Sequence, residues 1–318
     1  MSGVTWIVQN PLNHSLFLPT VIRVGILLAI GALAVILVER KPLSQLRQTV
    51  LFKRIFSWSV MAPTFLAAIF VGGPVGLLVI LYLILQGVSE YARLVGIDRP
   101  YAWLLLTAGL ITPVLTGLLS EYFLFAPLLF FVVVTSVPIL RGEVAGSHIQ
   151  VTSTLFGYTY IPFFLSYLIF IKLLEPDGLE ILLLVGVGVA LSDIVAFSLG
   201  KAFGGPKLAP AVSPNKTWTG ALGNLLGAYL AWAVMAFAIP DEWSLATRLI
   251  APLITAAAAI WGDLIESFVK RDFGVKDAGD LLPGFGGLLD RIDSLLVALP
   301  VSYYAIIITQ HFSVGPRT

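Results

Sequence analysis

Residues 262–294 hold most of the side chains in this sequence that could do chemistry on a charged substrate. These 33 residues carry seven carboxylates and four fixed positive charges, although only 12% of the whole chain is charged. Asp263 and Ser267 are four residues apart, so both lie on one face of a helix, with Glu266 beside them. A salt-bridged loop between two helices is the alternative interpretation, but such a loop has no need of this density of charge.

Two further carboxylates open the last apolar segment. Asp290 and Asp293 are three residues apart and share a helix face. The Gly-rich turn at 283–287 lets the chain fold back tightly, which can bring Asp290 near Asp263. Carboxylate oxygens suit Mg²⁺, which usually takes one or two protein carboxylates together with phosphate oxygens and waters. Nearby Lys and Arg side chains would offset the charge of a polyphosphate.

A second polar cluster, at 207–218, combines two hydroxyl groups with two ammonium groups. Ser213 and Thr217 supply the hydroxyls, and Thr217 is placed to cap the helix that follows. Lys207 and Lys216 bring positive charge to a helix N-terminus, where free N–H groups already attract anions. The pattern is typical of a phosphate site, and a solvated basic loop is the alternative interpretation.

A third polar feature is a carboxylate inside an apolar run. Asp193 follows Ser192 in a segment that becomes apolar near Ile181. A carboxylate within a membrane helix is costly, so it indicates a functional site by default. The other interpretation is an Asp near a helix end that pairs with Lys201.

The composition decides what kind of structure must position these groups. Of the 318 residues, 58% are hydrophobic and 12% are charged, whereas a soluble domain has roughly 45–50% apolar and roughly 25% charged residues. Too few polar side chains remain to cover a water-exposed globule, which excludes a soluble enzyme and a disordered chain. The net charge of +1 argues against a nucleic-acid partner. The absence of Cys excludes disulfides, thiolate metal sites and a Cys nucleophile.

The apolar segments predict an all-α, polytopic integral membrane protein with nine to ten transmembrane helices. A span needs roughly 20 mostly apolar residues, and the runs do not alternate as barrel strands do. The predicted spans are 20–38, 57–71, 74–92, 102–119, 123–140, 155–174, 180–200, 218–239, 246–266 and 289–309. The second is short and lies beside Gly72-Gly73-Pro74, so a tilted or re-entrant piece, and a count of nine, stays open.

The basic residues predict the orientation. Of the 19 Lys and Arg residues, 15 fall in five alternate connections, which are 39–56, 93–101, 141–154, 201–217 and 267–291. Cytoplasmic loops carry the excess of Lys and Arg, so these connections and the polar clusters are predicted to face the cytoplasm, in what we expect to be the cell inner membrane. For ten spans, both termini then lie outside.

The chain is expected to form a single membrane domain over residues 1–318. Residues 1–190 would form a lipid-embedded scaffold, and residues 190–294 would form the half that bears the motifs. The first 19 residues carry no Lys or Arg, so we expect no signal peptide and a retained first span.

The two larger polar clusters together resemble the signature of the phosphatidate cytidylyltransferases, also called CDP-diacylglycerol synthases. In the charged region the matching residues are Ser267, Lys270-Arg271, Lys276-Asp277, Gly279, Leu282-Pro283-Gly284, Gly286-Gly287, Asp290-Arg291 and Asp293. In the hydroxyl cluster they are Ser213, Pro214, Lys216, Thr217, Trp218 and Gly220. Asp193 stands where the family has an Asp in the helix upstream. The sequence departs from the pattern at Phe285 for a His, Thr219 for a Glu and Asn215 for a Lys.

The resemblance implies that a phosphate oxygen of phosphatidate attacks the α-phosphorus of CTP, giving CDP-diacylglycerol and pyrophosphate. It implies Mg²⁺, with room for a second cation, and the bilayer as partner; a homodimer is also kept open. As metal ligands we expect Asp263 and Asp290 first, and Asp193 and Asp293 as further ligands. The residues expected to act in catalysis on the phosphates of CTP are Lys270, Arg271, Lys276, Asp290 and Arg291. Those expected to bind the phosphate of either substrate are Lys207, Ser213, Lys216, Thr217 and Ser267.

Three alternatives stay open from the sequence. A related CTP-dependent enzyme acting on another lipid phosphate has the same requirements, and Phe285 points to a weakly active paralogue. Multiple spans and an intramembrane Asp193 also suit a transporter. A transporter places its polar groups near the bilayer midplane, whereas here they gather at one edge, which favours the enzyme.

Overall fold

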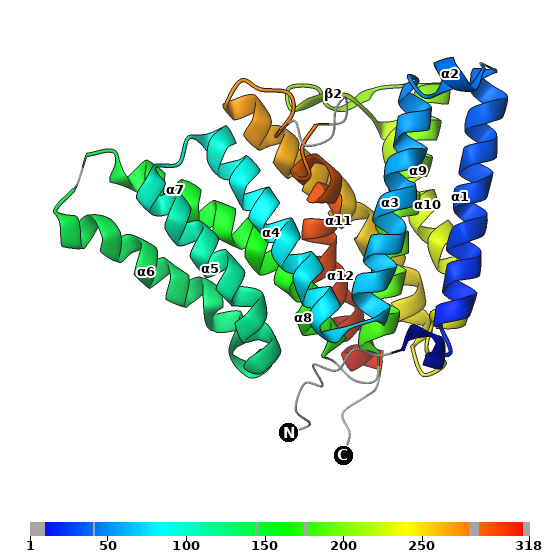
Figure 1. Ribbon diagram of the computed structural model, residues 1–318. Coiled ribbons are helices and arrows are strands. Elements are labelled where there is room, and N and C mark those ends of the chain that lie inside the picture. Colours follow the sequence, from blue (N-terminus) through cyan, green and yellow to red (C-terminus); the bar gives the residue numbers. More distant parts are fainter. Residues whose placement is uncertain (1–9, 41, 144, 174–176, 280–285, 314–318) are drawn as a thin grey trace. The chain divides into compact units, whose positions relative to one another are not determined.

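The computed structural model is mostly helical (Figure 1). It describes residues 10–40, 42–143, 145–173, 177–279 and 286–313. The chain divides into two compact units, Met1–Val79 and Ile80–Thr318. The predicted all-α class is confirmed, apart from one small hairpin described below.

The first unit is built on two long helices that pack against each other. Helix α1 spans Phe17–Glu39 and helix α3 spans Val50–Phe70, and the short α2 (Leu43–Leu46) lies between them in the chain. The Thr49 hydroxyl accepts a hydrogen bond from the Phe52 N–H at 3.3 Å, which caps the start of α3.

The second unit holds the rest of the chain, and α4 enters it from the first unit. Its elements are α4 (Gly73–Val95), α5 (Arg99–Leu118), α6 (Ala126–Arg141), α7 (Ser147–Tyr158), α8 (Phe164–Lys172), α9 (Gly178–Phe203), β1 (Lys207–Ala209), β2 (Ser213–Thr217), α10 (Trp218–Val234), α11 (Leu245–Asp272) and α12 (Leu289–Ser313). A π-helical turn at Thr159–Phe163 makes α7 and α8 one continuous segment.

The predicted spans coincide with these helices, since each falls on one helix or on consecutive helical segments. Within the described part of the chain, eight segments are long and apolar enough to cross a membrane: Phe17–Glu39, Gly73–Val95, Arg99–Leu118, Ser120–Arg141, Ser147–Lys172, Gly178–Phe203, Leu245–Asp272 and Leu289–Phe312. Helices α3 and α10 are not among them, and α10, with 17 residues, is shorter than the roughly 20 residues of a typical span. The chain is therefore a polytopic integral membrane protein, and the span predicted as a short piece at 57–71 belongs to the 21-residue α3.

Successive long helices of the second unit run in opposite directions. The connections that follow α4, α6, α9 and α11 therefore lie at one end of the unit, and Figure 1 shows β2 and the end of α11 together there. The hydroxyl cluster and the charged region are thus brought to the same end, although some 50 residues separate them in the sequence.

The segment between α9 and α10 forms an antiparallel hairpin, where the sequence had predicted a loop. Lys207 pairs with Thr217, and Ala209 pairs with Ser213. Thr217 is both the last residue of β2 and the cap of α10, because its hydroxyl accepts a hydrogen bond from the Gly220 N–H at 3.1 Å. The predicted helix cap is confirmed.

Helices α9 and α10 approach each other closely along glycines of α10. A Cβ at Gly227 would lie 2.6 Å from the Ser192 Cα, and one at Gly223 would lie 3.0 Å from the Ala196 Cα. These positions leave no room for a side chain, and small residues are the usual means by which membrane helices approach this closely. The contact holds the α9 segment that carries Asp193 against α10.

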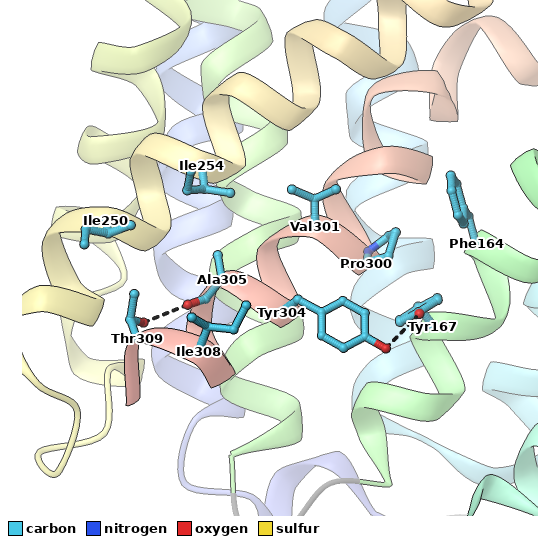
Figure 2. Close-up of a pocket in the computed structure, with 10 residues that line it drawn as sticks. All are labelled: Phe164, Tyr167, Ile250, Ile254, Pro300, Val301, Tyr304, Ala305, Ile308 and Thr309. Atoms are coloured by element: carbon cyan, nitrogen blue, oxygen red, sulfur yellow. Dashed lines mark hydrogen bonds between the residues drawn. The ribbon is translucent and has the colours of Figure 1, made fainter. Parts of the chain in front are cut away.

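An open apolar groove runs along the second half of α12, with α8 and α11 on its flanks (Figure 2). It has a volume of about 630 Å³ and is lined by Phe164, Tyr167, Ile250, Ile254, Pro300, Val301, Tyr304, Ala305, Ile308 and Thr309. The Tyr167 hydroxyl donates to the Tyr304 hydroxyl at 3.3 Å. Pro300 lies ten residues beyond Asp290, or roughly 15 Å along the helix, so the groove is separate from the charged region.

The replacement Gly227→Ala tests the close approach of α9 and α10. The added methyl must push the two backbones apart, and overpacking of this kind costs about 1–3 kcal/mol. We expect a lower midpoint of thermal unfolding in detergent. Gly25→Ala is the control, because a Cβ at Gly25 meets nothing within 4 Å. Equal midpoints for the two variants would show that the helices tolerate wider spacing.

Candidate active site

Helices α11 and α12 cross with their backbones in contact at Gly262. A Cβ at this position would lie 3.0 Å from the Ser294 Cα, so only glycine allows the crossing. The buried Tyr160 hydroxyl donates to the Gly262 carbonyl at 3.2 Å and ties the π-helical turn to the same point. The crossing places the polar face of α11 directly against the start of α12.

Lys270 is held between two carboxylates. Its ammonium forms an ion pair with Glu266, one turn earlier on α11, and a second one with the Asp290 Oδ1 at 2.6 Å. The three side chains are between 3% and 11% exposed, so this triad is almost entirely removed from water. An isolated charge at this depth would be costly, and the Lys270 ammonium compensates the two carboxylates, which repel each other.

Asp290 also binds the backbone on both sides of the turn that precedes α12. Its Oδ2 accepts hydrogen bonds from the Ala278 N–H at 3.1 Å and from the Gly287 N–H at 2.7 Å. The carboxylate therefore joins the first part of the connection that follows α11 to the residues directly before α12. Phe285 and most of the predicted turn at 283–287 lie outside the described residues.

A second ion pair connects the hairpin to α11. The Lys216 ammonium lies 2.6 Å from the Asp263 Oδ2, and the Ser267 hydroxyl donates to the Asp263 Oδ1 at 3.3 Å. The predicted common face of Asp263 and Ser267 is thus confirmed. The side chains of Lys216 and Asp263 are 23% and 36% exposed, so this pair is open to water while the Lys270 triad is closed.

Asp293 interacts with carboxylates of both ion pairs and with Asp193. Asp293 is buried, and the charges of Asp263, Glu266 and Asp193 all act on it. These acids come from α9, α11 and α12, so the structure unites the intramembrane Asp193 with the charged region.

The remaining predicted residues lie around this centre. Arg271 is exposed, and its guanidinium donates to the carbonyls of Val212 and Val275 at 3.3 and 3.0 Å. Lys207 and Lys276 are exposed, Ser213 is half-buried in β2, and Arg291 is half-buried directly after Asp290. The Thr217 hydroxyl is engaged as a helix cap, so its predicted contact with a phosphate stays a prediction.

Sequence reasoning missed Glu90, on α4. This carboxylate is fully buried, and it accepts hydrogen bonds from the Leu288 N–H at 3.0 Å and the Leu289 N–H at 2.9 Å. The Gln86 amide donates to it at 2.8 Å. The signal that could have found Glu90 is the same one that marked Asp193, a carboxylate inside an apolar helix.

The donor chemistry of the site suits Mg²⁺, but no preformed cage is present in the described residues. No three His, Asp or Glu side chains converge there in the way a metal site requires. Mg²⁺ usually takes only one or two carboxylates from the protein and completes its shell with phosphates and water. Asp263, at the open edge and beside Asp293 and Asp193, provides such hard oxygen donors, while both oxygens of Asp290 are already hydrogen-bonded. The predicted metal ligands stay predictions.

The fold and the site define an integral membrane protein that gathers cationic and anionic side chains at one end of its helices. Comparison with known proteins shows its family, since the model of the cytidylyltransferase family matches residues 52–309. The chain belongs to the cytidylyltransferase family, and the predicted resemblance is confirmed.

Individual relatives are similar over part of their length. The phosphatidate cytidylyltransferase of Brucella abortus is 45% identical over 131 residues, which cover 41% of this chain and 47% of the relative. That of Rickettsia bellii is 34% identical over 165 residues, covering 50% and 71%. The uncharacterized protein YnbB of Escherichia coli is 34% identical over 189 residues, covering 58% and 63%. The chain thus spans about half the length of the Brucella relative.

The replacement Lys270→Met tests the buried triad. Methionine keeps much of the side-chain volume but leaves Glu266 and Asp290 without their cation, and breaking a buried ion pair costs about 3–5 kcal/mol. We expect a large fall in the midpoint of unfolding in detergent. Lys201→Met is the matched control, because Lys201 is exposed and carries the same charge. Equal midpoints in the two variants would contradict the role of the triad in stability.

Proposed function

We propose that this protein transfers the cytidylyl group of CTP to phosphatidate, forming CDP-diacylglycerol and releasing pyrophosphate. The observation that carries the proposal is the alternation of ammonium and carboxylate groups at one end of a bundle of membrane-spanning helices. Family membership supports a nucleotidyl transfer with CTP, and the names of the Brucella and Rickettsia relatives support phosphatidate as the acceptor.

The chemistry asks the protein for positioning and charge neutralisation more than for proton transfer. A phosphate oxygen of the lipid forms a bond to the α-phosphorus of CTP, and the bond from that phosphorus to pyrophosphate breaks. The attacking oxygen is already anionic, so no general base is required. Fixed cations in a partly desolvated site stabilise the charge that develops in the transition state.

We assign the cationic residues to the phosphates. Lys270, Arg271, Lys276 and Arg291 would hold the phosphates of CTP, and Lys216 with Lys207 would hold a phosphate at the hairpin side. The hydroxyls of Ser213, Thr217 and Ser267 would add hydrogen bonds to the same groups. Lys216 and Lys270 are already held in place by their carboxylates, so little reorganisation precedes the reaction.

We assign the carboxylates to Mg²⁺, as ligands or as supports of ligands. Asp263 is the most open of them, and Asp193, Asp290 and Asp293 complete the predicted set. When bound, Mg²⁺ would neutralise the phosphates of CTP and favour departure of pyrophosphate. The predicted set has more carboxylates than one Mg²⁺ usually takes, so a second cation could share them.

A second candidate function is cytidylyl transfer to another lipid phosphate. The observation in its favour is the uncharacterized relative from Escherichia coli, which matches a longer stretch of this chain than the Brucella relative does. Transport is disfavoured, because the ion pairs of the described residues gather at one end of the helices.

A direct assay tests the function. Purified protein with radiolabelled CTP, Mg²⁺ and phosphatidate should form a CDP-lipid, and EDTA should abolish its formation. We expect Asp263→Asn and Asp290→Asn each to lower kcat by about 10²–10³-fold, since each removes charge stabilisation from the site. Asp241→Asn is the control, an exposed Asp in the connection before α11.

The assay has two independent ways to fail. Near wild-type turnover in both site variants would contradict the assignment of Asp263 and Asp290. A wild-type protein that makes no CDP-lipid from any member of a lipid-phosphate panel would contradict the function itself, whereas a product from another lipid alone would favour the second candidate.

We also propose that the site faces the cytoplasm, where CTP is available. The protein has no native Cys, so single cysteines report accessibility without a background. The excess of Lys and Arg predicts that Lys276→Cys reacts with an impermeant maleimide only in inside-out vesicles. Asp241→Cys, at the opposite end of α11, should react only in right-side-out vesicles. The reverse pattern would contradict the orientation.

A further inference from the structure

Glu90 is a buried carboxylate whose hydrogen-bonding partners, within the part of the chain that the structure describes, are uncharged. It lies near the end of α4, with no exposed surface, and its described hydrogen bonds come from the Gln86 amide and from the N–H groups of Leu288 and Leu289. Burying a carboxylate is costly unless several donors satisfy it. A carboxylate at this position must therefore make interactions that outweigh the free-energy cost of burying it.

The interactions that offset this cost are those with the N–H groups at the start of α12. The first N–H groups of a helix have no partner within the helix, and they favour negative charge. Glu90 places one oxygen on the Leu288 N–H and the other on the Leu289 N–H. A residue 198 positions earlier in the chain thus acts as the cap of α12.

Two glycines next to Glu90 leave room for its side chain. A Cβ at Gly279 would lie 3.0 Å from the Glu90 Cδ, and a Cβ at Gly287 would lie 2.7 Å from the same atom. These glycines stand at either side of residues 280–286, and Asp290 binds the N–H of Gly287 and of Ala278 beside Gly279. Asp290 therefore binds both ends of the connection, while Glu90 binds its second end and lies against Gly279 at the first.

We propose that Glu90 is a positioning residue of the active site, acting through the start of α12. By fixing Leu288 and Leu289, it fixes the direction in which Asp290 reaches Lys270 and the depth at which Asp293 meets the other carboxylates. Its part in turnover rests on the proposed function, whereas its part in holding α12 does not.

The experiment compares Glu90→Ala and Glu90→Gln with wild type. The alanine removes both acceptors, while the glutamine is isosteric and keeps one carbonyl oxygen as acceptor. Ile84→Ala is the matched control, because Ile84 is fully buried on the same helix and packs near Gly109 of α5. It weakens the packing of α4 at a site six residues, or roughly 9 Å along the helix, before Glu90.

Two measurements are made in detergent on the full-length protein. Hydrogen exchange of peptides covering residues 286–292 reports the cap directly. The Kd for CTP with Mg²⁺, measured by calorimetry, reports the geometry of the site and does not depend on the fraction of folded protein. Loss of a residue that supports binding groups typically costs about 10–100-fold in affinity or activity.

We expect Glu90→Ala to speed exchange at Leu288 and Leu289 and to raise the Kd at least about tenfold. Glu90→Gln should lie between Ala and wild type in both measurements, and Ile84→Ala should leave both unchanged while lowering the unfolding midpoint.

Wild-type exchange in Glu90→Ala would overturn the proposal, as would a Kd equal to that of Ile84→Ala. If Glu90→Ala does not fold, Glu90→Gln alone decides, and wild-type values for it overturn the proposal. Wild-type protein that binds no CTP would instead contradict the proposed function, and the exchange result would still decide the role of Glu90 at α12.

Discussion

Each charge placed within these helices must have a partner, because a hydrocarbon layer offers no water to solvate it. This constraint organises the site around Lys270. Its ammonium compensates Glu266 on its own helix and Asp290 on the next one, and the second oxygen of Asp290 is compensated by two backbone N–H groups. Removing Lys270 leaves two buried carboxylates without their cation, and removing Asp290 breaks the contact between α11 and the start of α12.

The same constraint produces a gradient of exposure across the site. Where α11 and α12 touch at Gly262, the carboxylate of Asp293 is buried, and the Lys270 triad is nearly so. Toward the hairpin, Lys216 and Asp263 are in contact with water. In the proposed reaction, a substrate phosphate that arrives from water would meet the exposed pair first, whereas the buried triad keeps a fixed geometry because no solvent competes for its hydrogen bonds.

The sequence predicted whatever depends on local spacing. Apolar runs located the helices, and the interval of four residues placed Asp263 and Ser267 on one face, where they form a hydrogen bond. Contacts between distant segments could not be derived in this way. No spacing relates Glu90 to Leu288, and no local pattern shows that Gly262 lets two backbones touch. The hairpin was missed because five residues with a proline give a weak strand signal.

The balance of charge in the centre explains why a cation and an anionic nucleotide would have to come together. The described cluster comprises the carboxylates of Asp193, Asp263, Glu266, Asp290 and Asp293 and the ammonium groups of Lys216 and Lys270. With all of these groups ionised, the carboxylates outnumber the ammonium groups, so the centre attracts cations and repels a free polyphosphate. A divalent cation that accompanies CTP would remove this repulsion by adding positive charge beside the carboxylates. Lys216 and Lys270, held by their carboxylates, would then lie beside the phosphates of the nucleotide. The ion pairs that stabilise the fold thus hold their lysines at the point where the proposed reaction would need them.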